Sequence, residues 1–151
     1  MKTLGLAMVA LALFVSPAGA ATINIPAIHL REQVTSNLNT GPAWWPVTGR
    51  PGGGDTIAIA GHRTTHTRPF HDIDRLKSGD RIYVRWGARS HAYVVTSRRV
   101  VSVNNLHISD AVGHERLILT ACAKRDGSPT SASYRIVVYA LPITQQRRTH
   151  G

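Results

Sequence analysis

The folded part of this chain is a succession of short apolar runs, each about one strand long. Val, Ile and Tyr favour strands and dominate these runs, and Gly, Pro, Asp and Ser stand between them. We expect strands over residues 22–28, 56–60, 81–86, 93–97, 100–103, 116–122 and 134–141. Residues 69–76 could hold one helical turn. Many short strands with little helix predict a closed or nearly closed β-barrel.

Two Pro-containing segments add detail to this pattern. Pro26 cannot donate a backbone hydrogen bond, so it predicts that the strand over 22–28 lies at a sheet edge. Residues 41–55, GPAWWPVTGRPGGGD, hold so many Gly and Pro residues that we expect no regular element there.

Length and composition indicate a single globular domain. The chain has 151 residues, 42% of them hydrophobic and 17% charged, which is typical of a packed domain and not of a disordered chain. We place this domain at residues 22–143, with a signal segment over 1–20 before it and a polar tail over 144–151 after it.

The first twenty residues, MKTLGLAMVALALFVSPAGA, have the pattern of an export signal. Lys2 gives a basic start, residues 4–15 form an apolar stretch, and residues 18–20 form an Ala-x-Ala cleavage site. An uncleaved membrane anchor is the alternative, but Ser16, Pro17 and Gly19 interrupt the apolar run. In either case we expect the domain on the extracellular side of the membrane or in the cell wall.

The charge is strongly positive, with a formal net charge of +10. Such a surplus favours anionic partners, and an exported protein meets anionic wall polymers and lipid head groups. The basic residues are scattered along the chain and form no dense block, so we predict no nucleic-acid partner.

Cys122 is the single cysteine, so the chain can form no internal disulfide. In an exported protein an unpaired thiol indicates either a reactive site or a buried, inert side chain. Cys122 ends an apolar strand, and Lys124 and Arg125 follow it with positive potential that favours the thiolate. If the strands over 116–122 and 134–141 pair antiparallel, Arg135 enters its strand close to Cys122. Alternatively, Arg135 rests on an edge strand and faces solvent.

His62 differs from the other histidines because it follows the strand over 56–60 directly, after Gly61. A general base at a strand end can reach into a cleft. His66 and His71 raise a metal-binding alternative, but the sequence indicates no helix to hold His62 and His66 on one face. We therefore predict no metal and no cofactor. The other five are most simply surface residues: His29, His91, His107, His114 and His150.

Three blocks of the sequence resemble the sortase family, in particular the class E sortases of high-GC Gram-positive bacteria. The first is INIPAI. The second runs over residues 41–84 and includes the Gly-Pro segment, Gly-His-Arg after a strand, and a Leu-x-x-Gly-Asp turn. The third is LILTAC followed by SYRIVVYA. The resemblance spans roughly residues 22–141 and implies a single sortase-like barrel of about seven to eight strands with short helical turns.

The resemblance also implies roles for individual residues. Cys122 is the expected nucleophile, His62 the group that protonates the departing amine, and Arg135 the oxyanion stabiliser or substrate-backbone ligand. The further candidates for substrate contact are Thr120, Ala121 and Trp45. Sortases have Thr before the catalytic Cys, and here Ala121 takes that place. Restoring Thr there is expected to increase acylation.

A sortase of this kind cleaves a Thr-Gly bond in a C-terminal sorting motif and transfers the acyl group to an amine of a cell-wall precursor. Two alternatives remain at this point. One is a non-catalytic, basic cell-wall-binding module on a sortase fold. The other is an L,D-transpeptidase, although that family places His and Gly just before its Cys and ILTAC has neither.

Overall fold

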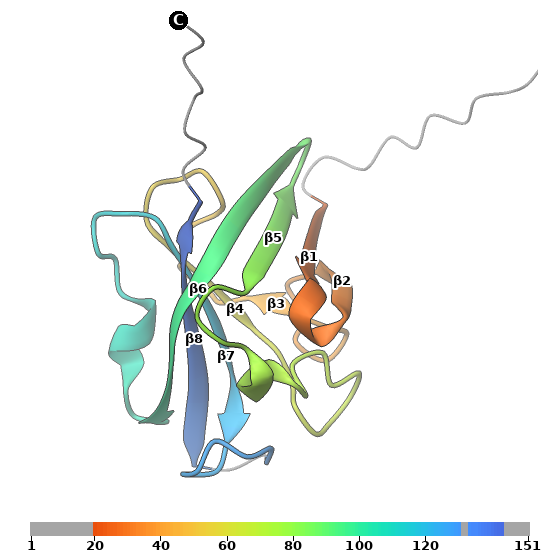
Figure 1. Ribbon diagram of the computed structural model, residues 1–151, viewed down its shortest axis with the longest axis vertical. Coiled ribbons are helices and arrows are strands. Elements are labelled where there is room, and N and C mark those ends of the chain that lie inside the picture. The colour runs from red at the N-terminus through yellow and green to blue at the C-terminus, as the bar shows by residue number, and fades with distance from the viewer. Residues whose placement is uncertain (1–19, 131–132, 144–151) are drawn as a thin grey trace, which may run out of the picture.

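The computed structural model describes residues 20–130 and 133–143. Within these residues the chain forms eight strands and three short 3₁₀ helices (Figure 1). The strands are β1 (Ala21–Ile25), β2 (Leu30–Val34), β3 (Ala43–Trp44), β4 (Thr56–Ala60), β5 (Arg81–Trp86), β6 (Arg89–Ser102), β7 (Arg116–Ala123) and β8 (Tyr134–Pro142). The helices are η1 (Pro26–Ile28), η2 (Ile73–Arg75) and η3 (Leu106–Ser109).

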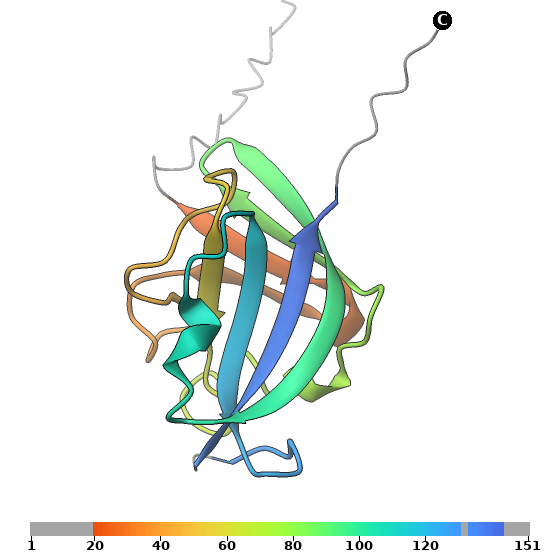
Figure 2. The same ribbon diagram turned by 90° about the vertical axis from the view of Figure 1, so that its left-hand side faces the viewer.

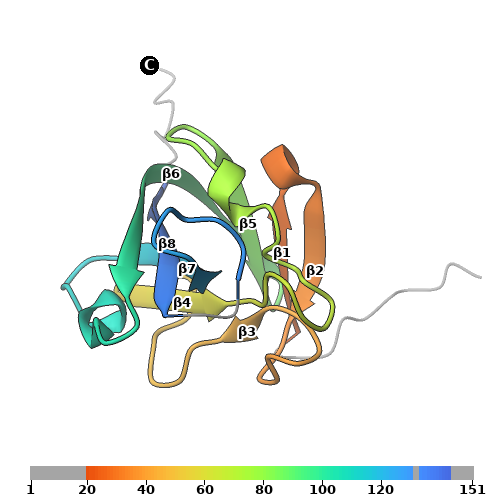
Figure 3. The same cartoon turned by 90° about the horizontal axis from the view of Figure 1, so that it is seen from below.

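The strands form one sheet in the order β2-β1-β5-β6-β8-β7-β4-β3. The two edges of this sheet meet, because Thr35, just after β2, forms a parallel bridge with Ala43 of β3. The strands therefore surround a common interior, as the view along the barrel shows (Figure 3). The architecture is mainly β and nearly closed, which confirms the predicted barrel.

The core fills the barrel interior with alternate residues of each strand. Along β7, for example, Leu117, Leu119, Ala121 and Ala123 all belong to the main buried cluster. Ile118 lies on the opposite face, in a second, smaller cluster with Ala58, Ile108 and Val137. β7 is thus covered on both faces, and it lies between β8 and β4 in the sheet (Figure 2).

Four details of the predicted strands are corrected. Pro26 begins η1, and β1 ends before it and lies between β2 and β5, so the predicted edge position is wrong. The segments 93–97 and 100–103 are parts of one strand, β6, whose register shifts between Val95 and Ser97. β2 was not predicted, and β3 lies inside the segment expected to be irregular. The helical turn expected in residues 69–76 is confirmed by η2.

No helix in the described part of the chain is long and apolar enough to cross a membrane. The predicted signal segment falls on residues outside that part, apart from residue 20, and the predicted polar tail falls wholly outside it. Both stay predictions.

Candidate active site

Cys122 and Arg135 face each other across the β7–β8 ladder, where they are direct register partners. The guanidinium Nη1 of Arg135 donates to the Sγ of Cys122 at 3.3 Å and to the carbonyl oxygen of Tyr134 at 3.3 Å. Both residues are partly exposed, and Cys122 carries a free thiol. The predicted juxtaposition is confirmed, and a permanent cation stands within contact distance of the sulfur.

His62 reaches the same end of the barrel because β4 runs parallel to β7. Ala60 pairs with Thr120 as the last register pair, and His62 and Cys122 each lie two residues farther along their chains. The Gly61 amide extends the ladder by donating to the Thr120 carbonyl at 3.1 Å. The segments that follow β4 and β7 accordingly lie at one end of the molecule (Figures 1 and 3).

The backbone of His62 is fixed from the opposite side by Phe70. The Phe70 amide donates to the His62 carbonyl at 3.0 Å, and the Phe70 side chain is fully buried. Gly61 makes this approach possible, because a Cβ there would lie 2.5 Å from Cδ2 of the Phe70 ring. A side chain at position 61 would therefore collide with the group that holds His62.

The imidazole of His62 has two neighbours. Its Nε2 lies 3.4 Å from Oδ1 of Asn39, and its ring stacks on His66 with centroids 4.6 Å apart. The pKa of His62 is lowered, first because burial disfavours the charged ring and second because of repulsion from His66. Both effects favour the neutral imidazole.

The histidine rings are not arranged as metal ligands. His62 and His66 stack nearly parallel, at 21°, and His71 uses Nδ1 to contact the Arg63 carbonyl at 2.9 Å. Across residues 20–130 and 133–143, no group of three or more His, Cys, Asp or Glu side chains could hold a metal ion.

The candidates Thr120 and Ala121 lie on opposite faces of β7. Ala121 is 4% exposed and belongs to the interior cluster, so its side chain faces the core and away from the thiol. The expectation that the side chain of Ala121 contacts substrate therefore lacks support, because strand alternation turns it inward. Thr120 is 1% exposed, and its hydroxyl has no hydrogen-bond partner within the described residues.

Trp45 lies on the outer face of the sheet but at a distance from the thiol. It packs against the outer cluster that includes Ala58 and Ile118, and its amide donates to the Ala58 carbonyl at 2.8 Å. Ile118 precedes Cys122 by four residues on β7, which corresponds to about 13 Å of strand. The substrate contact predicted for Trp45 stays a prediction.

Sequence reasoning missed two residues beside the site, Asn39 and Arg63. Asn39 lies 23 residues before His62 in an exposed segment, and no local pattern links the two. Arg63 stands next to His62 in the Gly-His-Arg motif and was treated as one of many scattered basic residues. It is 1% exposed, and this burial has no signal in the sequence.

Comparison with known proteins agrees with this geometry. The family model for the sortase domain matches residues 20–143. The chain belongs to the sortase family. Sortase SrtE1 of Streptomyces coelicolor is 31% identical over 104 residues, which cover 63% of this chain and 28% of that relative. The match thus spans little more than a quarter of that sortase, and its class agrees with the class E resemblance.

Solved sortases share the barrel. Sortase E1 of Streptomyces coelicolor, crystallised with a tripeptide in its active site, is 25% identical with a TM-score of 0.74, covering 84% of this chain and 89% of that one. The sortase D5 transpeptidase of Clostridium perfringens is 24% identical with a TM-score of 0.73, covering 83% and 79%. A pilus-related sortase C of Group B Streptococcus is 22% identical with a TM-score of 0.75, covering 86% and 70%.

Proposed function

We propose that this sortase is a cysteine transpeptidase with Cys122 as nucleophile, His62 as proton-transfer group and Arg135 as electrostatic stabiliser. The observation that carries the proposal is the 3.3 Å contact between Arg135 and the Cys122 sulfur at the strand end that His62 also occupies. A thiol, an imidazole and a cation held at one end of the barrel provide the groups that acyl transfer through a thioester needs.

The reaction has two balanced halves. The Cys122 thiolate adds to the carbonyl carbon of Thr in a Thr-Gly bond and forms a tetrahedral oxyanion, whose collapse breaks the C–N bond and leaves a thioester. The departing amine takes a proton from the imidazolium of His62. An incoming amine then attacks the thioester, gives its proton to His62 and releases the thiolate. Arg135 faces the sulfur, where it can donate to the oxyanion formed in each half.

This mechanism needs thiolate and imidazolium in the same molecule. An ordinary thiol and an ordinary imidazole would give about 3% and about 24% of these forms at pH 7, so under about 1% of molecules would hold both. The lowered pKa of His62 reduces the imidazolium fraction further. We therefore expect a small active fraction whose size depends on His62.

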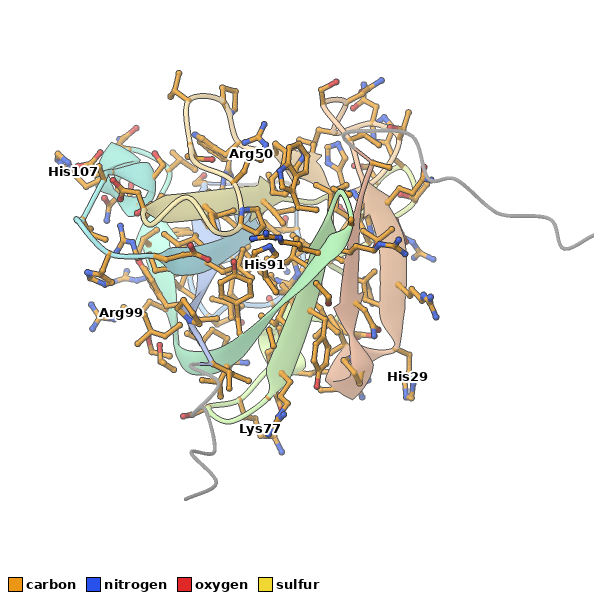
Figure 4. The ribbon with its side chains drawn as sticks, turned by 90° about the horizontal axis from the view of Figure 1, so that it is seen from above. His29, Arg50, Lys77, His91, Arg99 and His107 are labelled. Atoms are coloured by element: carbon orange, nitrogen blue, oxygen red, sulfur yellow. The ribbon has the colours of Figure 1, made fainter. Side chains whose placement is uncertain are left out.

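The proposed partners are proteins with a C-terminal sorting motif and an amine of a cell-wall precursor. We place the enzyme outside the cytoplasm, on the strength of the signal-like pattern of residues 1–20. Anionic wall polymers suit the basic surface, where His29, Lys77, Arg99 and His107 project outward (Figure 4). A hollow over β1, β2, β5 and the start of β6 contains two arginines and no acidic residue. Its lining consists of Thr22, Asn24, Arg31, Tyr83, Arg85 and Ser90.

The test is incubation with a panel of peptides of the Leu-Ala-x-Thr-Gly type and a small amine, followed by mass spectrometry. We expect an acyl adduct on Cys122 and a transpeptidation product, both absent in Cys122→Ala. His62→Ala should lower turnover severely, whereas His66→Ala should not. Residual turnover in Cys122→Ala would refute the nucleophile. No adduct with any peptide would favour the non-catalytic wall-binding module.

A further inference from the structure

We propose that Arg63 is a positioning residue that holds the segment carrying His62 and the segment following Cys122 at a fixed separation. The role rests on the proposed function, because it matters for catalysis only if His62 and Cys122 act together. Arg63 is the one buried charged residue in the described part of the chain, with a side chain that is 0% exposed. Arginine is rarely buried to this extent without partners.

The guanidinium of Arg63 uses all three of its nitrogens. Nη1 donates to the carbonyl oxygen of Gly127 at 2.7 Å. Nε and Nη2 donate to the carbonyl oxygen of His71 at 3.3 and 3.2 Å, and Nη2 also donates to Oδ1 of Asp74 at 2.7 Å. One planar group thus joins three acceptors on two chain segments, an arrangement that the single ammonium of Lys does not reproduce.

The contact with Gly127 joins the segment that carries His62 to the segment that follows Cys122. Arg63 follows His62 directly, and Gly127 lies five residues after Cys122. The Gly127 turn is itself closed, since the Lys124 amide donates to the Ser128 carbonyl and the Gly127 amide to the Lys124 carbonyl, both at 2.9 Å. The contact between Arg63 and Gly127 therefore joins two ordered segments.

This contact adds a second connection beyond the ladder. Before His62 and Cys122, the Gly61 amide binds the Thr120 carbonyl. After them, Arg63 binds Gly127. The His62–Cys122 pair is thus enclosed between two cross-links, one on each side along the chain. A pair fixed in this way keeps its reacting groups aligned, and a misplacement of about 1 Å can lower a rate by about a hundredfold.

The test compares Arg63→Met and Arg63→Lys with wild type, and uses Arg75→Met as the matched control. Arg75 is exposed, and its ion pair with Asp72 is weak, with Nη1 lying 3.8 Å from Oδ1, so loss of the Arg75 side chain should change little. All variants are assayed well below their unfolding temperatures, with the folded fraction measured by circular dichroism. Four quantities are compared: kcat, KM, the rate of Cys122 alkylation by iodoacetamide, and hydrogen exchange of the segments 61–72 and 124–128.

We expect Arg63→Met to lower kcat per folded molecule by about 10- to 100-fold, with KM within about threefold. Alkylation of Cys122 should stay within about twofold, because the contact with Arg135 is retained. Exchange should rise in both segments together. Arg63→Lys should give intermediate values, and it replaces Arg63→Met in the comparison if Arg63→Met does not fold. Arg75→Met should match wild type.

A variant with normal kcat per folded molecule and only a lower unfolding temperature would overturn the proposal, since Arg63 would then be a structural anchor alone. Exchange that rises in one segment only would overturn it as well. Failure of the proposed function has a different signature: wild type itself forms no adduct with any peptide. Hydrogen exchange still decides in that case whether Arg63 couples the two segments.

Discussion

Replacing Gly61 by Ala tests how His62 is held. An added Cβ would lie 2.5 Å from Cδ2 and 2.6 Å from Cγ of the Phe70 ring, where ordinary contacts begin at 3.4 Å. The ring must therefore move by roughly 1 Å, and because Phe70 is 0% exposed it has no solvent to move into. Overpacking of this kind costs about 1–3 kcal/mol. For a domain of this size that corresponds to a Tm lower by about 3–15 °C.

The same displacement should reach the chemistry, because the Phe70 amide binds the His62 carbonyl. We expect Gly61→Ala to lower kcat by about 10- to 100-fold at a temperature where the protein is folded. The assays are thermal unfolding by circular dichroism and single-turnover acylation followed by mass spectrometry. Gly41→Ala is the matched control, since its new Cβ meets only the mobile end of Glu32, at 3.2 Å, and a backbone oxygen at 3.6 Å.

A double mutant isolates the collision from other effects. Phe70→Leu removes the ring that the new Cβ would meet. The loss of unfolding free energy in Gly61→Ala/Phe70→Leu should therefore be smaller than the sum of the losses in the two single variants, by about 0.5–3 kcal/mol. Additive losses would mean that the ring is not what opposes a side chain at position 61. A Gly61→Ala protein with unchanged Tm and unchanged acylation rate would refute the reasoning entirely.

Three further changes probe residues at the site. Arg135→Ala should lower kcat by at least about 100-fold with a smaller change in KM, and Arg135→Lys should restore only part; a raised KM with normal kcat would make Arg135 a binding residue. His66→Gln should raise the pKa of His62, because it reduces the burial of the His62 ring and removes the repulsion from His66. The acidic limb of the pH profile of kcat/KM then moves to higher pH, and an unmoved limb would contradict this. Ala121→Thr should lower stability by about 1–3 kcal/mol in thermal unfolding without faster acylation, because the new hydroxyl enters the core; faster acylation would contradict the inward orientation.

Strands that are covered on one or both faces could be predicted from the sequence. The runs TIAIA, RLILTAC and YRIVVYAL are dense in β-branched and apolar residues because they line the core, and each is a strand in the structure. β2 was missed because only Leu30 and Val34 of LREQV are buried and the three residues between them are polar. Its place in the barrel comes from pairing with β1, which local composition does not encode.

At the site, the sequence predicted the contact that depends on neighbouring strands, which is the one between Cys122 and Arg135. The short link between the strands that end at Cys122 and begin near Arg135 made their pairing foreseeable, and the ladder confirms it. Asn39 and Arg63 could not be assigned, because their contacts depend on how separate segments fold together. Arg63 contacts Gly127 across 64 residues of chain. Burial decides its role, and burial is a property of the tertiary structure.

Thr120 offers the last test, because strand alternation places its side chain, and not that of Ala121, on the Cys122 face. Its hydroxyl is buried without a partner in the described part of the chain, and such a group costs about 1–3 kcal/mol. Thr120→Val keeps the shape and removes that cost, so we expect a higher Tm. If the hydroxyl donates a hydrogen bond to the substrate, its loss should lower kcat/KM about tenfold, the value of one hydrogen bond. Thermal unfolding and peptide acylation measured on one preparation separate the two effects. A lower Tm would mean that the hydroxyl is satisfied in solution, and a higher Tm with full activity would make Thr120 a packing residue that takes no part in the reaction.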